Sequence, residues 1–226
     1  MEGGVNGASE GAVNKAERAG VLTANAWADG IAASSALEAS MFGPSGDAST
    51  SGVRVTLPGV VGLLVVRADP ESTALAGAFS EVLDLPLPER LGSTASGACC
   101  ARWISPDEWL LSCPPAECAE VERGLRNALD GAFSVTEVTG GYALLELSGP
   151  EARTVLAKST PLDVDPRAFS PGRVAGTVFA KTTVTLRHVD DGRYELICRR
   201  SFADYVARWI ARASDEHGLS VTEARG

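Results

Sequence analysis

Residues that hold metals and cofactors are scarce in this sequence. Its two histidines, His188 and His217, have no second ligand at metal-binding spacing, and its five cysteines form no C-x-x-C pair. Neither a G-x-G-x-x-G nor a G-x-x-x-x-G-K loop occurs. We therefore expect no metal site and no cofactor-binding residue in this chain.

Positive charge and long apolar runs are also limited. The chain has 20 lysine and arginine residues against 29 aspartate and glutamate residues, so it offers no basic surface for nucleic acid. No apolar run approaches the roughly 20 residues of a membrane-spanning helix. The opening MEGGVNGASEG lacks a basic segment followed by an apolar one. We expect a cytoplasmic protein with reduced thiols and without nucleic-acid or membrane partners.

Residues 1–52 contain mainly glycine, alanine and serine. Trp27 and Phe42 are their only aromatic residues, and no periodic apolar pattern is sustained. Such a segment cannot bury enough apolar surface to offset the ordering of its backbone, so the prediction is a flexible N-terminal tail. A transient helix that Trp27 and Ile31 hold in a groove is the alternative.

Residues 53–226 alternate short apolar strands with amphipathic helices, which indicates an α+β domain. The pattern occurs twice. GLLVVRADPE and YALLELSGPE open two similar units, and WLLSC in the first corresponds to YELIC in the second. We therefore predict two pseudo-repeats, at about 53–130 and 131–216, each built as a β/α unit.

Local signals predict turns and a helix start. SPDE is expected to be a turn between the strands CCARWI and WLLSC, with Pro106 at its second position. Gly140-Gly141 is predicted to be a hairpin turn. Ser148 and Glu151 have the spacing of a capping box, in which each side chain accepts a hydrogen bond from the other residue's backbone amide.

The five cysteines are interpreted as inert. Cys99 and Cys100 are neighbours in a predicted strand, so they point to opposite faces, and neither lies at a helix N-terminus that would favour a thiolate. Cys113, Cys118 and Cys198 have no activating histidine motif. We expect each of the five to be replaceable without loss of activity.

Four ionisable residues have a structural and a functional interpretation. His188 continues the apolar alternation of its strand, which favours a partly buried, hydrogen-bonded side chain over a base. Glu146 lies in an apolar strand; exposure to solvent or pairing with an arginine is favoured over ligand binding. Asp107 and Glu108 are adjacent carboxylates, for which turn chemistry is favoured over catalysis.

Two arginines and two tryptophans complete the candidates. Arg199 and Arg200 precede a helix, where surface ion pairs or partner contacts are favoured over an anionic ligand. Trp103 and Trp109 flank the SPDE turn and are either core or interface residues. No nucleophile is found with a base, so the sequence contains no catalytic constellation.

Three motifs together resemble the gamma subunit of heterotetrameric sarcosine oxidase. They are SPDEWLL at 105–111, LSGPEARTVLAKSTPLDVDPRAFSPG at 147–172 and YELICRRSFADYVARWI at 194–210. Their order and spacing agree with those of the family. The resemblance covers about residues 53–214, and SSALE at 34–38 is similar to a short N-terminal motif of the family.

The resemblance implies duplicated β/α units like the folate-binding domain of glycine-cleavage aminomethyltransferases. It also implies a non-catalytic gamma subunit that supports a complex with alpha, beta and delta subunits, which oxidatively demethylates sarcosine to glycine. FAD, FMN, NAD and zinc would belong to those partners, tetrahydrofolate would be used by the complex, and no cofactor would belong to this chain.

Two alternatives stay open. One is a free-standing folate-binding protein of the aminomethyltransferase type, although the chain is short for one and the K-G-C-Y-x-G-Q motif of tRNA-modification factors is absent. The other is a structural adaptor of another amine-oxidising complex. The sequence does not distinguish sarcosine from a related N-methyl amino acid as the substrate.

Overall fold

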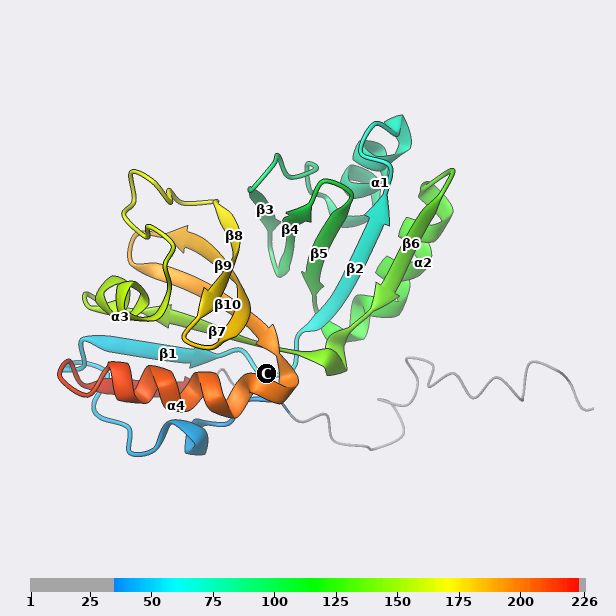
Figure 1. Ribbon diagram of the computed structural model, residues 1–226. Coiled ribbons are helices and arrows are strands. Elements are labelled where there is room, and N and C mark those ends of the chain that lie inside the picture. The colour runs from blue at the N-terminus through cyan, green and yellow to red at the C-terminus, as the bar shows by residue number, and fades with distance from the viewer. Residues whose placement is uncertain (1–34, 224–226) are drawn as a thin grey trace, which may run out of the picture. The chain divides into compact units, whose positions relative to one another are not determined.

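The computed structural model describes residues 35–223, which form an α+β fold with two β-sheets (Figure 1). The helices are α1 Thr73–Leu83, α2 Cys118–Ala128, α3 Ala152–Ser159 and α4 Ala203–Ala213. The strands are β1 Val53–Leu57, β2 Gly62–Ala68, β3 Ser93–Ser96, β4 Cys99–Ser105, β5 Glu108–Cys113, β6 Phe133–Glu137, β7 Tyr142–Ser148, β8 Val174–Phe179, β9 Thr182–Asp190, β10 Arg193–Arg199 and β11 Leu219–Glu223. The predicted α+β class is confirmed.

The two halves of the chain follow the same path. The elements β2-α1-β3-β4-β5-α2-β6 correspond in order to β7-α3-β8-β9-β10-α4-β11. The first sheet has the strand order β3-β4-β5-β2-β6, and the second sheet has the order β11-β1-β7-β10-β9-β8. The segment GLLVVRADPE contains β2, and the similar segment YALLELSGPE contains the corresponding strand β7. In the same way, WLLSC in β5 corresponds to YELIC in β10.

The repeat boundaries predicted from the sequence place two strands with the wrong sheet. β1, which the sequence assigned to 53–130, pairs antiparallel with β7 and parallel with β11 in the second sheet. β6, which was assigned to 131–216, pairs antiparallel with β2 in the first sheet. The repeat boundaries drawn from the sequence are therefore wrong for these two strands. Apolar alternation identifies a strand, but its partner depends on which core receives its apolar face.

Of the two predicted hairpin turns, the structure contains one, at SPDE, and not the other, at Gly140-Gly141. Thr139–Gly141 form a 3₁₀ turn, η4, and the strands β6 and β7 on either side of it belong to different sheets. The predicted hairpin at Gly140-Gly141 is therefore wrong, because this turn carries the chain from the first sheet to the second. The SPDE turn does join the antiparallel strands β4 and β5.

Helices cover one face of each sheet (Figure 1). On the first sheet, Phe79 of α1 and Leu125 of α2 belong to one buried apolar cluster. A Cβ atom at Gly124 would lie 2.8 Å from Cγ1 of Val82, so glycine at this position lets α1 and α2 approach closely.

None of the helices within residues 35–223 is long and apolar enough to cross a membrane.

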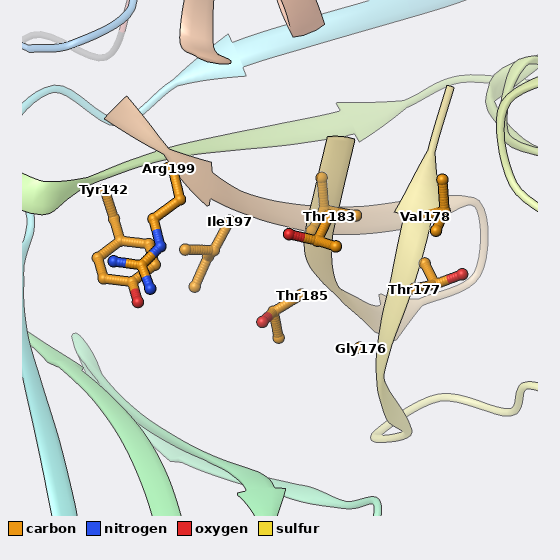
Figure 2. A pocket seen from close by; sticks show the side chains of 9 residues that line it. Tyr142, Gly176, Thr177, Val178, Thr183, Thr185, Ile197 and Arg199 are labelled. Atoms are coloured by element: carbon orange, nitrogen blue, oxygen red, sulfur yellow. The ribbon is translucent and has the colours of Figure 1, made fainter. Parts of the chain in front are cut away.

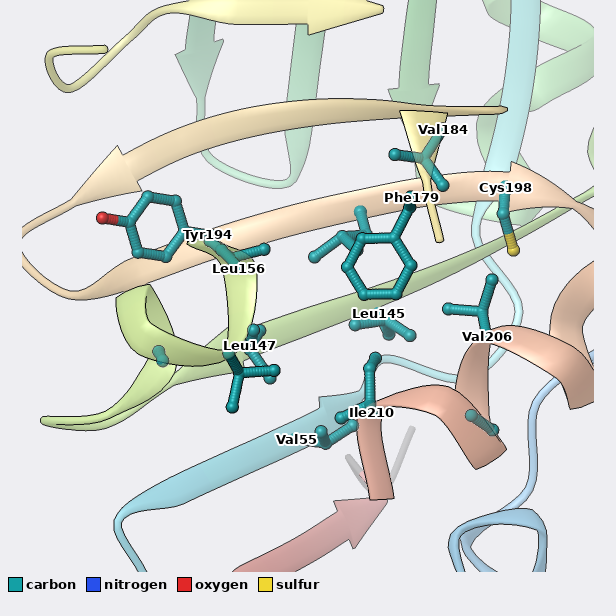
Figure 3. Packing of buried hydrophobic residues seen from close by; sticks show 14 of the residues in the cluster. Val55, Leu145, Leu147, Leu156, Phe179, Val184, Tyr194, Cys198, Val206 and Ile210 are labelled. Carbon is teal, nitrogen blue, oxygen red and sulfur yellow. The ribbon is translucent and has the colours of Figure 1, made fainter. Parts of the chain in front are cut away.

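The second core lies between the second sheet and helices α3 and α4. Figure 3 shows Leu145 of β7, Phe179 of β8 and Val206 and Ile210 of α4 packed together, and all four are at most 1% exposed. The strand residues alternate between this core and the opposite face, as the period of two requires. One face of the second sheet is therefore fully occupied by packing.

The capping box predicted at the start of α3 does not form. Ser148 ends β7, and the N-cap residue is Glu151, which makes no side-chain cap bond. The amide of Glu151 donates instead to the carbonyl oxygen of Gly52 at 3.0 Å. A Cβ atom at Gly149 would lie 2.5 Å from that oxygen, so the close approach of the two backbones replaces the local cap.

Part of the expected N-terminal tail belongs to the folded domain. Leu37 and Phe42 are 2% and 3% exposed and lie in the second core. The amide of Gly46 donates to the carbonyl of Leu219 at 2.7 Å, which ties this segment to β11. The tail boundary at 52 is therefore too late in the sequence. Residues 1–34, with Trp27 and Ile31, lie outside the described part.

We expect Phe42→Ala to lower the free energy of unfolding by about 3–5 kcal/mol, because it leaves a cavity where a buried ring was. Ser40→Ala is the matched control, since Ser40 is exposed in the same 3₁₀ turn. Denaturant titration of both variants measures the difference. Equal stability of the two variants would show that residues 35–52 do not pack on the domain in solution.

Candidate functional site

The faces of the two sheets that carry no helix meet over a small apolar patch. Leu63 and Leu110 of the first sheet and Leu144 and Ile197 of the second form this cluster, and each is at most 9% exposed. Its small size leaves part of both faces for polar groups.

A buried ion pair joins the sheets beside this patch. Arg102 of β4 donates through Nε and Nη2 to the two carboxylate oxygens of Glu195 of β10, at 2.6 and 2.7 Å. The two side chains are 1% and 7% exposed. Nη1 of Arg102 donates to Ser112 Oγ at 3.0 Å, and Nη1 of Arg187 lies 3.8 Å from Glu195. Arg102 and Glu195 thus form a bidentate pair, and Ser112 accepts from a further donor of Arg102. Buried charges need partners of this kind.

The charge on Glu195 is maintained by its partners. Burial alone would raise the pKa of Glu195, but the Arg102 guanidinium, with a smaller contribution from Arg187, holds this pKa below its usual value. Burial likewise opposes the charge on Arg102, and Glu195 nevertheless raises the pKa of Arg102. Both groups are therefore ionised at neutral pH, and neither is poised to exchange a proton. The pair joins β4 of the first sheet to β10 of the second.

The uncovered part of the second sheet's inner face forms a shallow pocket of about 400 Å³, here called the inner-face groove (Figure 2). Its lining includes Tyr142, Val178, Thr183, Thr185, Ile197 and Arg199. The Arg199 guanidinium carbon lies 4.8 Å from the centre of the Tyr142 ring, a cation–π contact. The lining offers hydroxyl and guanidinium donors and no carboxylate, so it suits an anionic or hydroxylated group.

The structure assigns His188 a packing role. It is fully buried, and its ring stacks against Tyr194 at a centroid distance of 4.6 Å. Nδ1 donates to the carbonyl of Phe169 at 2.6 Å, since a carbonyl oxygen can only accept. The structural interpretation of His188 is confirmed.

The acidic candidates are used in ion pairs and turns. Asp107 accepts from Nη2 of Arg67 at 2.6 Å and from the Ser105 hydroxyl at 2.9 Å, and these two bonds lower its pKa. Glu108 lies 3.9 Å from Nε of the same arginine. Glu146 lies on the inner face, 3.9 Å from Arg193, and burial raises its pKa. Turn chemistry for the Asp107-Glu108 pair and an arginine partner for Glu146 are both confirmed.

The candidate tryptophans, cysteines and arginines lie in different parts of the structure. Trp109 is 2% exposed and packs edge-to-face on Phe79 at 6.0 Å, so it is a core residue, and Trp103 packs against the same cluster. All five cysteines are free thiols. Arg200 is exposed at the start of the 3₁₀ turn before α4, whereas Arg199 lines the inner-face groove.

Residues 35–223 contain no group of three or more His, Cys, Asp and Glu side chains that could hold a metal ion. Sequence reasoning did not identify the pair Arg102 and Glu195, which are 93 positions apart. The available signal was one charged residue inside each of the apolar strands CCARWI and YELIC. That signal marks an unusual position without naming its partner.

Comparison with solved structures first defines the class of fold. The chain is similar to the glycine cleavage system aminomethyltransferase T from Bartonella henselae, with a TM-score of 0.56 and 12% identity over 76% of this chain and 48% of that one. At this identity the likeness concerns the fold alone. The protein thus has a duplicated α+β fold that is similar to the fold of this aminomethyltransferase.

The particular family follows from sequence. Residues 67–216 match the sarcosine oxidase, gamma subunit family, and the chain belongs to it. It is 34% identical over 154 residues to the sarcosine oxidase subunit gamma of Corynebacterium sp. (strain P-1), covering 67% of this chain and 74% of the relative. An Arthrobacter subunit gamma is also 34% identical, over 158 residues and the same shares of the two chains.

A solved relative agrees with this assignment. A chain of the heterotetrameric sarcosine oxidase from Corynebacterium sp. U-96, in complex with pyrrole 2-carboxylate, is 28% identical with a TM-score of 0.67. The match covers 73% of this chain and 85% of that one. The family resemblance drawn from SPDEWLL and its companion motifs is confirmed.

We expect Arg102→Met to lower the free energy of unfolding by about 3–5 kcal/mol, because it leaves the Glu195 carboxylate buried without its partner. The double variant Arg102→Met/Glu195→Leu should regain most of this loss, since neither charge of the Arg102–Glu195 pair is then left buried. Arg208→Met, at an exposed pair with Asp204, is the control and should change little. Chemical denaturation measures all three; a double variant no more stable than Arg102→Met alone would contradict the account.

The pair also predicts a pH dependence. The folded-state pKa of Glu195 lies below its reference value of 4.5, so the unfolded chain binds the proton more readily. The stabilisation is therefore present above pH 4.5 and is lost as the pH falls through the folded-state value. Below pH 4.5, we expect stability to fall more steeply in the wild type than in Arg102→Met/Glu195→Leu. Chemical denaturation at a series of pH values measures the stability of both proteins. An equal dependence of stability on pH in the two would contradict this expectation.

Proposed function

We propose that this chain is the gamma subunit of a heterotetrameric sarcosine oxidase and that it supports assembly without catalysing the reaction. Membership of the gamma subunit family carries this proposal. The distribution of side chains supports it, because within residues 35–223 the candidates for acid–base chemistry are engaged in structure. His188 is stacked and hydrogen-bonded, and Asp107 is held by Arg67.

Under this proposal the partners are the alpha, beta and delta subunits. FAD, FMN, NAD and zinc are held by those subunits, and tetrahydrofolate is used by the complex. A subunit without catalytic residues still affects turnover, because groups on its neighbours must be held close to their productive geometry. A displacement of about 1 Å can reduce a rate by about 100-fold.

A free-standing folate-binding protein of the aminomethyltransferase type is the second candidate. Two observations favour it: the likeness in fold to aminomethyltransferase T and the inner-face groove with its donor-rich lining. Calorimetric titration of the purified chain with tetrahydrofolate distinguishes the two functions. Saturable binding that Arg199→Ala weakens would favour the second candidate, and absence of heat would favour the first.

We expect the purified chain alone neither to bind flavin nor to oxidise sarcosine, and the complex to need it for stable activity. Complexes expressed with and without this chain are compared by sarcosine-dependent peroxide formation, flavin content and mass. Adding the separately purified chain back to the deficient complex is the control for expression effects. Equal activity and composition without the chain would refute the subunit role, and turnover by the isolated chain would refute the non-catalytic one.

A further inference from the structure

Two cysteines meet where the first sheet passes into helix α2. Cys113 is the last residue of β5 and Cys118 is the first residue of α2, and the short segment 114–117 joins them. Their sulfur atoms are 3.4 Å apart, and the residues are 1% and 2% exposed. A Cβ atom at Gly62 would lie 2.2 Å from the sulfur of Cys118, so the glycine leaves room for that sulfur beside β2. The backbone thus holds the two thiols face to face.

The two thiols are chemically unequal. The two sulfur atoms share a hydrogen bond. This hydrogen bond lowers the pKa of Cys118, and burial opposes the effect. The same hydrogen bond, together with burial, raises the pKa of Cys113. Cys118 is therefore the thiol of the pair that loses its proton more readily. A thiolate is the form that reacts with oxidants and disulfides.

The remaining cysteines lack such a partner geometry in the described part of the chain. Cys198 lies in the second core, where burial raises the pKa of its thiol to about 11. Cys100 is buried beside Arg102 on the other face of β4, and burial raises its pKa. Cys99 is partly exposed, and burial is also the largest cause of its raised pKa.

We propose that Cys113 and Cys118 form a disulfide when the protein meets hydrogen peroxide. The Cys118 thiolate attacks one peroxide oxygen and becomes a sulfenic acid, and the hydroxide released takes a proton to become water. The Cys113 thiol then attacks the Cys118 sulfur, the S–O bond breaks, and a second water leaves. Two thiols lose two electrons in total and one peroxide is reduced to two waters. The proposal does not depend on the oxidase role, because added peroxide supplies the oxidant.

Tryptic mapping tests the disulfide directly. Cleavage after Arg102 and Arg123 gives a peptide that contains Cys113 and Cys118 and no other cysteine, while Cys99 and Cys100 fall in the preceding peptide. The full-length chain is treated with graded hydrogen peroxide, unfolded and alkylated before digestion. We expect the 103–123 peptide to lose two hydrogens and escape alkylation, and the peptides with Cys99, Cys100 and Cys198 to be alkylated as before.

Single variants separate the two steps. In Cys113→Ser the Cys118 sulfenic acid has no resolving thiol and should be trapped by dimedone, whereas Cys118→Ser should show neither sulfenic acid nor disulfide in this peptide. Cys99→Ser is the matched control and should behave as the wild type. Retention of two alkylated thiols in the 103–123 peptide of folded wild-type protein, or a disulfide through Cys99, would overturn the proposal without recourse to the variants.

Discussion

The buried pair between Arg102 and Glu195 is the constraint on which the rest of the domain depends. Each partner comes from a different sheet, and only a bidentate contact at 2.6 and 2.7 Å makes the loss of water around both charges tolerable. Such a contact is directional, unlike the apolar cluster around Leu110 and Ile197 beside it. The apolar cluster and the ion pair both join the two sheets, and the ion pair is the contact that depends on the orientation of its groups.

The pairing of β1 adds a second constraint. β1 precedes the first repeat, yet it pairs with β7 and β11 in the second sheet. The amide of Ser93 also donates to the carbonyl of Gly172, and the amide of Val174 donates to the carbonyl of Leu91, so the two repeats cannot separate without breaking backbone hydrogen bonds.

The candidate ionisable and aromatic side chains take part in packing and in ion pairs. His188 stacks on Tyr194 of β10, Asp107 pairs with Arg67 of β2, and Trp109 packs on Phe79 of α1. The inner-face groove presents donors without a nucleophile or a base in its lining. Cys113 and Cys118 are the exception, because the sulfur atom of each contacts the sulfur atom of the other.

The sequence by itself determined the elements and the family. Apolar alternation located strands such as YALLELS, the i, i+3, i+4 spacing of apolar residues located the helix containing Leu75 and Phe79, and the order of three motifs was enough to recognise the family. These features are local, or follow from order along the chain. Only the tertiary structure decided which sheet receives β1 and β6, that Gly52 replaces the Ser148 cap, that Phe42 is buried and that Arg102 meets Glu195. Each of these is a contact between residues distant in sequence, and no local propensity specifies the partner of such a contact.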